Sequence, residues 1–203
     1  MNPILLSVAG NPENQDRGRI IYDGPKTILC VADGAGGLSG GREAAIMATE
    51  WLRCHGSHAT NAESCGEALR TLDTAIFADA LAGETTCVLV VVSAYEIFGA
   101  SVGDSGAWFV PTSGSLINLT QFQKRKPFLG SGSAQPIPFR HSVVPGNLLL
   151  ATDGLLKYTS AEKITAVCRD NPFDLAPHGL LELVRFPSGA FPDDVTVILY
   201  KVE

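Results

Sequence analysis

Between Thr85 and Thr120 the sequence is a succession of short apolar runs separated by tight turns, and this block constrains the fold more than any other feature. Runs of this length, bounded by glycine, serine and proline, are typical of β-strands joined by short connections. Strands joined in this way pair antiparallel. The predicted strands are Thr86–Ala94, Glu96–Val102, Ala107–Pro111 and Leu116–Leu119. The block therefore predicts antiparallel sheet.

The segments on either side of this block add helices and further strands. Before it, the predicted strands are Ile4–Ala9, Arg19–Tyr22 and Thr27–Ala32, with a hairpin turn at Asp23-Gly24, and the predicted helices are Arg42–Arg53 and Glu63–Leu81. After it, we expect a strand pair in His141–Thr152 broken at Pro145-Gly146, helices at Ala161–Arg169 and Asp174–Val184, and a last strand, Val195–Val202. Because strict βαβ alternation is absent, this order predicts an α+β layered fold. With no repeat or linker visible, residues 1–203 are expected to form one domain.

Composition narrows the class of protein. A chain of 203 residues with 45% hydrophobic and 18% charged residues can bury one good core. The net charge of −6 argues against a nucleic-acid partner, which would favour a basic face. An anionic substrate remains compatible with this charge, because bound cations can reverse it locally.

Targeting and redox signals are weak. The apolar start, residues 1–10, lacks the charge and length of a signal peptide, and the longest apolar runs have strand length. The five cysteines are widely spaced and include no CxxC pair. We therefore expect a soluble, cytoplasmic protein with no membrane partner and no thiolate metal site.

Five aspartates share one placement, at the start or end of a predicted apolar strand: Asp16, Asp33, Asp104, Asp153 and Asp193. Carboxylates that converge at strand ends repel one another unless a cation neutralises them. Hard divalent ions such as Mg²⁺ and Mn²⁺ prefer such oxygen ligands. Asp-Gly can also mark an ordinary turn, which is our interpretation of Asp23-Gly24, while Asp153-Gly154 taken alone fits a turn and a ligand equally well. The set as a whole predicts a metal-dependent hydrolase.

A glycine-rich segment follows Asp33, with the sequence GAGGLSGG over residues 34–41. A dinucleotide-binding loop would need a third glycine where Ser39 stands, and a phosphate-binding Walker loop would need Lys and Ser or Thr where Arg42 and Glu43 stand. Both nucleotide-binding patterns therefore fail. The segment would instead let a backbone carbonyl, such as that of Gly34, approach a metal.

Read in order, these pieces resemble the metal-dependent protein phosphatases of type 2C, in their compact bacterial form. The matching segments are Asn14-Gln15-Asp16, VADGAGG (31–37) followed by GGREAA, Gly83–Thr86, GDSGAWFV (103–110), SLINLT (115–120), ATDGL (151–155) and DDVTVIL (193–199). They cover the chain from about Asn14 to its end. The VADGAGG loop and the terminal DDVTV are the most specific of them.

The resemblance implies a four-layer α-β-β-α sandwich of two mainly antiparallel sheets flanked by helices, with two Mn²⁺ or Mg²⁺ ions at one edge. It implies that Asp33 bridges both ions, that the Gly34 carbonyl binds one, and that Asp153 and Asp193 hold the other. Asp16 would contribute directly or through a water, and Asp104 would join Asp153 at a weaker third metal. Asp194, where the family usually has Asn, would support the ligands without binding metal.

The implied activity is hydrolysis of phosphoserine or phosphothreonine in proteins, opposing a serine/threonine kinase. Through Asp33, Asp153 and Asp193 the two metals would hold the water or hydroxide that attacks phosphorus, so no side-chain nucleophile is required. Two other functions stay open on the sequence. One is a phosphatase-like binding module that acts in signalling by contact, and the other is hydrolysis of small phosphate esters.

Three departures from the family pattern affect the substrate side of the site. Asn11 stands where the family usually has the arginine that holds the substrate phosphate, which leaves the phosphate-binding residue unknown. Arg17, Arg19 and Arg42 are candidates, although each is also compatible with a solvated arginine. Ala35 replaces a histidine found in many eukaryotic members, and the long flap segment after Thr120 is largely missing.

Overall fold

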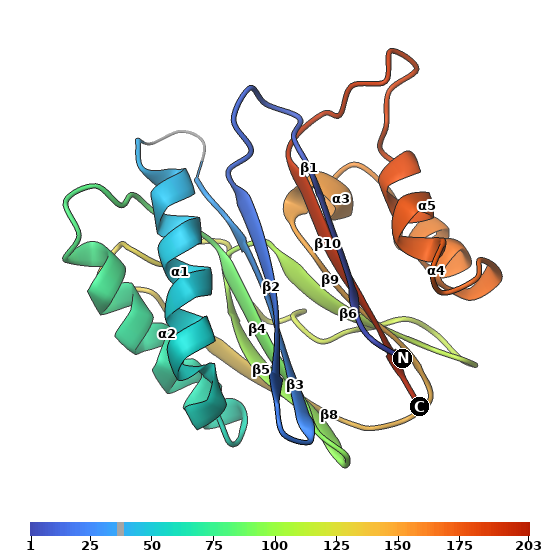
Figure 1. Ribbon diagram of the computed structural model, residues 1–203, viewed down its shortest axis with the longest axis horizontal. Helices are drawn as coiled ribbons and strands as arrows, with labels where there is room; N and C mark the ends of the chain where they lie inside the picture. The colour runs from blue at the N-terminus through green and yellow to red at the C-terminus, as the bar shows by residue number, and fades with distance from the viewer. Residues whose placement is uncertain (36–38) are drawn as a thin grey trace.

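Two five-stranded antiparallel sheets face each other in this computed structural model, and helices cover the outer face of each (Figure 1). The structure describes residues 1–35 and 39–203. One sheet has the order β1 (Ile4–Val8), β10 (Val195–Val202), β9 (Gly146–Ala151), β6 (Gly106–Pro111) and β7 (Ile117–Asn118). The other has the order β2 (Asp16–Asp23), β3 (Lys26–Asp33), β4 (Cys87–Val92), β5 (Glu96–Val102) and β8 (Ile137–Ser142). The predicted α+β sandwich is thereby confirmed.

The helices form the two outer layers. The second sheet is covered by α1 (Gly41–His55) and α2 (Ala62–Phe77), which are joined through the short 3-10 turn η1 (Gly56–His58). The first sheet is covered by α4 (Ala161–Asp170) and α5 (Ala176–Glu182), and the one-turn helix α3 (Asp153–Leu156) directly follows β9. None of the helices in the described ranges is long and apolar enough to cross a membrane.

Strand β3 shows why the sequence reads as continuous apolar runs. Successive side chains of a strand point to opposite faces of its sheet. Leu29 and Val31 pack into the core between the two sheets, whereas Ile28, Cys30 and Ala32 pack against α1 and α2. Because both faces of this strand are buried, an alternating polar pattern is absent.

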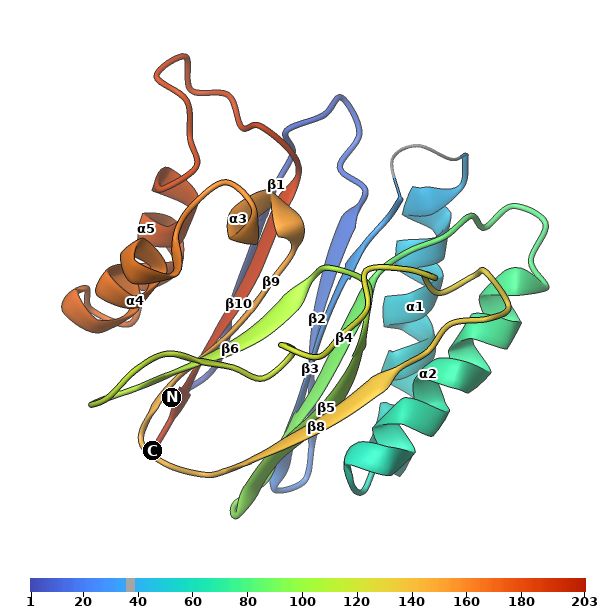
Figure 2. The ribbon, with the colours of Figure 1, turned by 180° about the vertical axis from the view of Figure 1, so that it is seen from behind.

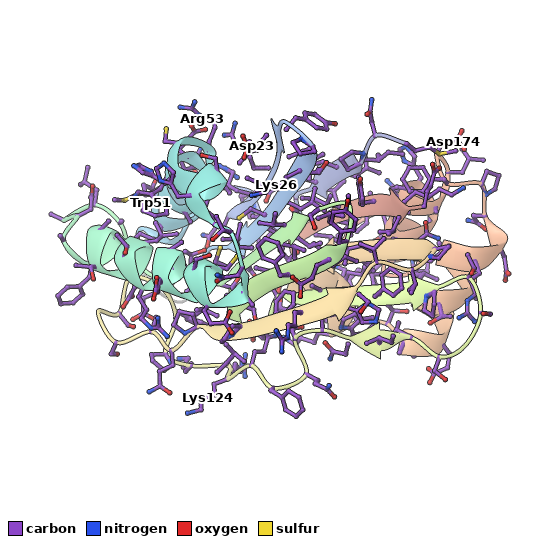
Figure 3. All side chains as sticks on the ribbon, turned by 90° about the horizontal axis from the view of Figure 1, so that it is seen from below. Asp23, Lys26, Trp51, Arg53, Lys124 and Asp174 are labelled. Carbon is purple, nitrogen blue, oxygen red and sulfur yellow. The ribbon has the colours of Figure 1, made fainter. Side chains whose placement is uncertain are left out.

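The hairpin between β2 and β3 turns at Asp23-Gly24, as the sequence predicts. Asp23 and Lys26 are opposite each other in the strand register, near the tip of the hairpin in Figure 3. Gly24 has a φ of 56°, a left-handed conformation that glycine adopts without steric cost. The register of the whole hairpin follows from this turn.

Helix α2 begins as its sequence suggests and ends earlier. The Asn61 side chain accepts a hydrogen bond from the backbone N–H of Ser64 (2.8 Å), and the Ser64 hydroxyl accepts one from the N–H of Asn61 (3.0 Å). This reciprocal cap starts the helix. The helix ends at Phe77 instead of Leu81, because the Asp79 carboxylate accepts the N–H groups of Leu81 and Ala82 and turns the chain.

The predicted strand pair in residues 141–152 is wrong. Strand β8 pairs with β5 in one sheet, while β9 pairs with β6 and β10 in the other. The Pro145-Gly146 segment therefore carries the chain from one sheet to the other, at the end of the sandwich where the termini lie (Figure 2). The burial patterns explain the difference: β8 is an edge strand with alternating exposure, whereas β9 is almost fully buried.

Candidate active site

The β2–β3 hairpin places two of the predicted aspartates side by side. Asp16 begins β2 and Asp33 ends β3, and the antiparallel register pairs them directly. Asp16 is buried, with 2% of its surface exposed, and Asp33 is partly buried. A one-residue slip of either strand would move its carboxylate to the other face of the sheet and separate the pair.

Two threonines at the start of β4 fix the backbone of Asp33. The Asp33 N–H donates to the Thr86 hydroxyl (3.0 Å), and the Asp33 carbonyl accepts from the Thr86 N–H (2.8 Å) and the Thr85 hydroxyl (2.9 Å). Thr85 also forms a β-bridge with Gly34. The Gly83–Thr86 motif of the sequence thus holds the end of β3 in place through these hydrogen bonds.

The second sheet contributes its carboxylates through β9 and β10. Asp153 follows β9 as the first residue of α3, and Asp193 precedes β10. Between them, the N–H of Thr196 donates to the Thr152 hydroxyl (2.9 Å), and this hydroxyl donates to Asp16 Oδ2 (2.7 Å). Thr152 therefore ties the acidic residues of one sheet to those of the other.

Asp194 is an anchor for the loop between β1 and β2. Its Oδ1 accepts the N–H groups of Gly10 (2.8 Å) and Asn11 (3.0 Å), and its Oδ2 accepts the N–H of Gln15 (2.8 Å). The Asn11 amide donates to Asp193 Oδ1 (3.0 Å). The residue at the position of the family's arginine thus binds a predicted metal ligand.

Burial and neighbouring charges shift the pKa values of three acidic residues of the site, and Asp33 is affected most. Burial, and after it the charges of the Asp16, Asp153, Asp104 and Asp193 carboxylates, together raise the pKa of Asp33 to about 10. Burial also raises the pKa of Asp16 to about 7, against the opposing effect of its hydrogen bond from Thr152. The pKa of Asp153 is raised by burial and by the charges of Asp104 and Asp193. The predicted carboxylates therefore lie close enough together for the charge of one to raise the pKa of another.

A cleft of about 860 Å³ opens over Asp33, Asp104, Asp153 and Asp193, whereas the buried Asp16 does not line it. Its acidic lining comprises Glu13, Asp33, Glu84, Asp104, Asp153, Asp193 and Asp194. Three basic residues, Arg125, Lys126 and Lys157, also line it. Sequence reasoning missed this basic set, for which the run of Lys124, Arg125 and Lys126 was the available signal.

Gly34 lies where no side chain fits. A Cβ on this residue would come within 2.4 Å of the backbone of Gly41, at the start of α1. Its N–H approaches the carbonyl of Gln15 (3.4 Å), so its backbone is held beside the acidic residues. Residues 36–38 of the predicted metal-approaching loop lie outside the described part of the chain.

The three predicted phosphate-binding arginines do not line the cleft. Arg19 forms an ion pair with Glu50 of α1, and Arg42 lies 3.8 Å from Glu43. The Arg17 guanidinium donates to the backbone carbonyls of Asn14 and Asp16. Arg125 differs from all three, because its Nε donates to Asp104 Oδ2 (2.7 Å) within the cleft.

The donor set suits a hard divalent cation in its chemistry. Within the described residues, Asp16 Oδ1 is buried without a hydrogen-bond partner, and a cation would satisfy it. In the same ranges, no three His, Cys, Asp or Glu side chains are already arranged to hold an ion. Binding would therefore draw the mutually repelling carboxylates inward.

Solved structures define the class of fold. The serine/threonine phosphatase Stp1 from Staphylococcus aureus matches with a TM-score of 0.85 at 20% identity, over 99% of this chain and 94% of that one. The Mycobacterium tuberculosis serine/threonine phosphatase PstP/Ppp matches with a TM-score of 0.83 at 22% identity, over 100% and 98%. The PstP catalytic domain in complex with two manganese ions matches with the same values. The fold is that of bacterial serine/threonine phosphatases.

The family follows from the sequence. The profile of the family described as protein phosphatase 2C matches residues 8–173, and the chain belongs to this family. A comparison with curated protein sequences gave no significant match. The resemblance found in the motifs is thereby confirmed, while the roles of individual site residues stay predictions.

Proposed function

We propose that this protein is a metal-dependent phosphatase that hydrolyses phosphoserine and phosphothreonine in proteins. One observation carries the proposal: burial, together with the charges of carboxylates from both sheets, raises the pKa of Asp33 to about 10. A folded protein retains such a repulsive group at a cost, which a bound cation would offset. Membership of the protein phosphatase 2C family supports the same chemistry.

In this proposal the residues that hold two divalent cations are Asp16, Asp33, Gly34 through its carbonyl, Asp153 and Asp193. When bound, such cations supply an activated water and stabilise charge on the phosphoryl oxygens. The chain itself positions the ligands: Thr85 and Thr86 fix the backbone of Asp33, and Thr152 orients Asp16. Such prior positioning lowers the cost of reaching the transition state.

Mn²⁺ and Mg²⁺ both suit these oxygen donors. The PstP neighbour that contains two manganese ions favours Mn²⁺ as the first ion to test. The substrates would be phosphoproteins, the opposing enzyme a serine/threonine kinase, and the compartment the cytoplasm.

A second candidate function is a phosphatase-like module that acts by contact. Asn11 supports it, because this residue stands at the position of the family's phosphate-binding arginine and its amide donates to Asp193. Loss of a bidentate phosphate contact would weaken substrate binding. The convergence of carboxylates on Asp33 favours the enzyme over this alternative.

The test is hydrolysis of an aryl phosphate and of a phosphothreonine peptide with Mn²⁺, with Mg²⁺ and with chelator. We expect turnover with metal that chelator abolishes, and its loss in Asp33→Asn and Asp153→Asn. The matched control is Asp174→Asn, which changes an exposed aspartate outside the cleft. Turnover that persists with chelator would refute the metal mechanism, and a folded protein inactive with every metal would support the binding module.

A further inference from the structure

The cleft needs a cationic group for the substrate phosphate, and the family's arginine is replaced by Asn11. A phosphate dianion that enters an acidic cleft meets repulsion unless positive groups compensate for it. The cleft-lining cations among the described residues are Arg125, Lys126 and Lys157. Besides the proposed metal ions, these three side chains are therefore the candidates for binding the phosphate.

Arg125 is the best placed of the three. Its Nε donates to Asp104 Oδ2 at 2.7 Å, which fixes the guanidinium, and its Nη1 and Nη2 atoms make no hydrogen bond to any described residue. Lys126 lies over the ring of Phe128 at 5.5 Å, and Lys157 lies over the ring of Tyr158 at 5.3 Å. Only the guanidinium offers two parallel N–H donors, the geometry that matches a phosphate.

The segment that carries Arg125 is anchored on both sides. Before it, the Gln123 amide donates to the carbonyl of Ser105 (2.8 Å). After it, Leu129 and Thr85 exchange backbone hydrogen bonds of 2.9 and 3.0 Å. Thr85 is also the residue whose hydroxyl binds the Asp33 carbonyl, so one threonine positions both the arginine segment and the centre of the acidic cluster.

Stability gives no sufficient reason for the Arg125–Asp104 pair. The Arg125 side chain is 72% exposed, and exposed ion pairs contribute between about 0 and 1 kcal/mol. The pair does neutralise Asp104, for which the family resemblance implies a role at a weaker third metal. An arginine in this place supplies a permanent positive charge without that ion.

We propose that Arg125, held by Asp104, is the phosphate-binding residue of this site and takes the place of a third cation there. The proposal rests on the function proposed above, because the bound phosphate is that of the substrate. Asp104 is then the residue that positions the guanidinium. Nη1 and Nη2 of Arg125 donate to the phosphate oxygens, while the core metal ligands are unaffected.

Binding and turnover are measured separately on Arg125→Ala, Arg125→Lys and Asp104→Asn. Calorimetry with Mn²⁺ present measures the affinity for inorganic phosphate. Calorimetry with Mn²⁺ alone measures how many Mn²⁺ ions bind, and steady-state kinetics with the phosphothreonine peptide give kcat and KM. The control is Arg140→Ala, an exposed arginine on β8 outside the cleft.

We expect Arg125→Ala to weaken phosphate binding and raise KM by about 10- to 100-fold, the loss typical of charge-assisted hydrogen bonds. Arg125→Lys should recover part of the lost phosphate affinity, and Asp104→Asn should reduce that affinity less than Arg125→Ala does. The number of Mn²⁺ ions bound should be unchanged in all three variants. Unchanged phosphate affinity in Arg125→Ala, or one fewer Mn²⁺ bound by Asp104→Asn, would overturn the proposal.

The outcome is distinguishable from failure of the proposed enzyme. If the wild-type protein binds phosphate without hydrolysing the peptide, and Arg125→Ala loses that binding, the arginine assignment stands and the enzyme fails. If the wild-type protein turns over the peptide and Arg125→Ala matches it in KM, the enzyme stands and the arginine assignment fails. A wild-type protein that binds no phosphate with metal present would refute the assignment directly.

Discussion

Asp33→Asn should stabilise the metal-free protein even though it removes the central residue of the site. The carboxyl group of Asp33 is surrounded by Asp16, Asp104, Asp153 and Asp193, and burial and these charges together raise its pKa to about 10. Asparagine has nearly the same shape and carries no charge at any pH. Its amide can also donate to the neighbouring carboxylates, as a protonated Asp33 would.

The size of the effect follows from linkage between protonation and folding. A raised pKa stabilises the folded state fully only below the pKa of the unfolded chain, about 3.8, and this contribution is lost as pH rises. Each pH unit above that value costs about 1.4 kcal/mol, so the limit near pH 7.5 is about 5 kcal/mol. Movement of the carboxylates and entry of water into the open cleft reduce this to about 2–3 kcal/mol. For a chain of this size the melting temperature should rise by about 5–10 °C.

The assay is thermal unfolding of the wild type, Asp33→Asn and the control Asp174→Asn, with chelator, at pH 5 and pH 7.5. Asp174 is an exposed aspartate away from the cleft, beside the α4–α5 layer (Figure 3), and should shift the melting temperature little. The gain in melting temperature from Asp33→Asn should be smaller at pH 5, because this pH is closer to the pKa that Asp33 has in the unfolded chain. With Mn²⁺ the order should reverse, because only the wild type would gain binding energy.

Two results would refute this reasoning. A metal-free Asp33→Asn protein that melts at or below the wild-type temperature would show that the carboxylate cluster is not destabilising. An advantage of equal size at both pH values would show that it does not come from ionisation. Either result would also remove the observation on which the proposed metal site depends.

Three further predictions concern the frame of the site. Gly154→Ala should lower the free energy of unfolding in urea by about 1–3 kcal/mol, because its Cβ would lie 1.9 Å from the backbone oxygen of Asp194. Asp73→Ala should destabilise the protein more than Asp73→Asn and speed amide exchange in residues 130–134, because the Asp73 carboxylate accepts three backbone N–H groups there. The metal-free wild type should melt at a lower temperature at pH 8 than at pH 5. The pKa of Asp16 is raised to about 7 in the folded protein, so stability falls as pH rises, and Mn²⁺ should reduce this fall.

The sequence predicted the fold where local pattern and tertiary packing agree. The stripe of Leu69, Leu72 and Ile76 predicted α2, and all three side chains are buried in the cluster that joins the helix to its sheet. The pattern was wrong for residues 141–152, because apolar runs around Pro145-Gly146 look the same whether the strands pair or separate. Which sheet a strand joins depends on the burial of both its faces, and that is set by distant segments.

The acidic residues of the site could be predicted because each lies at a strand end, and strand ends of a two-sheet sandwich meet at its edges. Their role as metal ligands stays a prediction. The run of Lys124, Arg125 and Lys126 marked a basic segment, but the place of Arg125 in the cleft could not be foreseen, because this segment has no regular structure. Its place in the cleft depends on the bonds of Gln123 to Ser105 and of Leu129 to Thr85, which are contacts between distant parts of the chain.

The same long-range contacts suggest why the acidic cluster is tolerated. Asp16 and Asp33 belong to one sheet and Asp153 and Asp193 to the other, so their repulsion acts across the sandwich. Thr152 opposes it by donating a hydrogen bond to Asp16 from the other sheet, and the apolar core between the sheets holds the two together. A module that acted by contact alone would gain stability from neutral residues at these positions. The presence of four acidic residues here, with an arginine bonded to the neighbouring Asp104, therefore favours a site that uses cations and phosphate over one that does not.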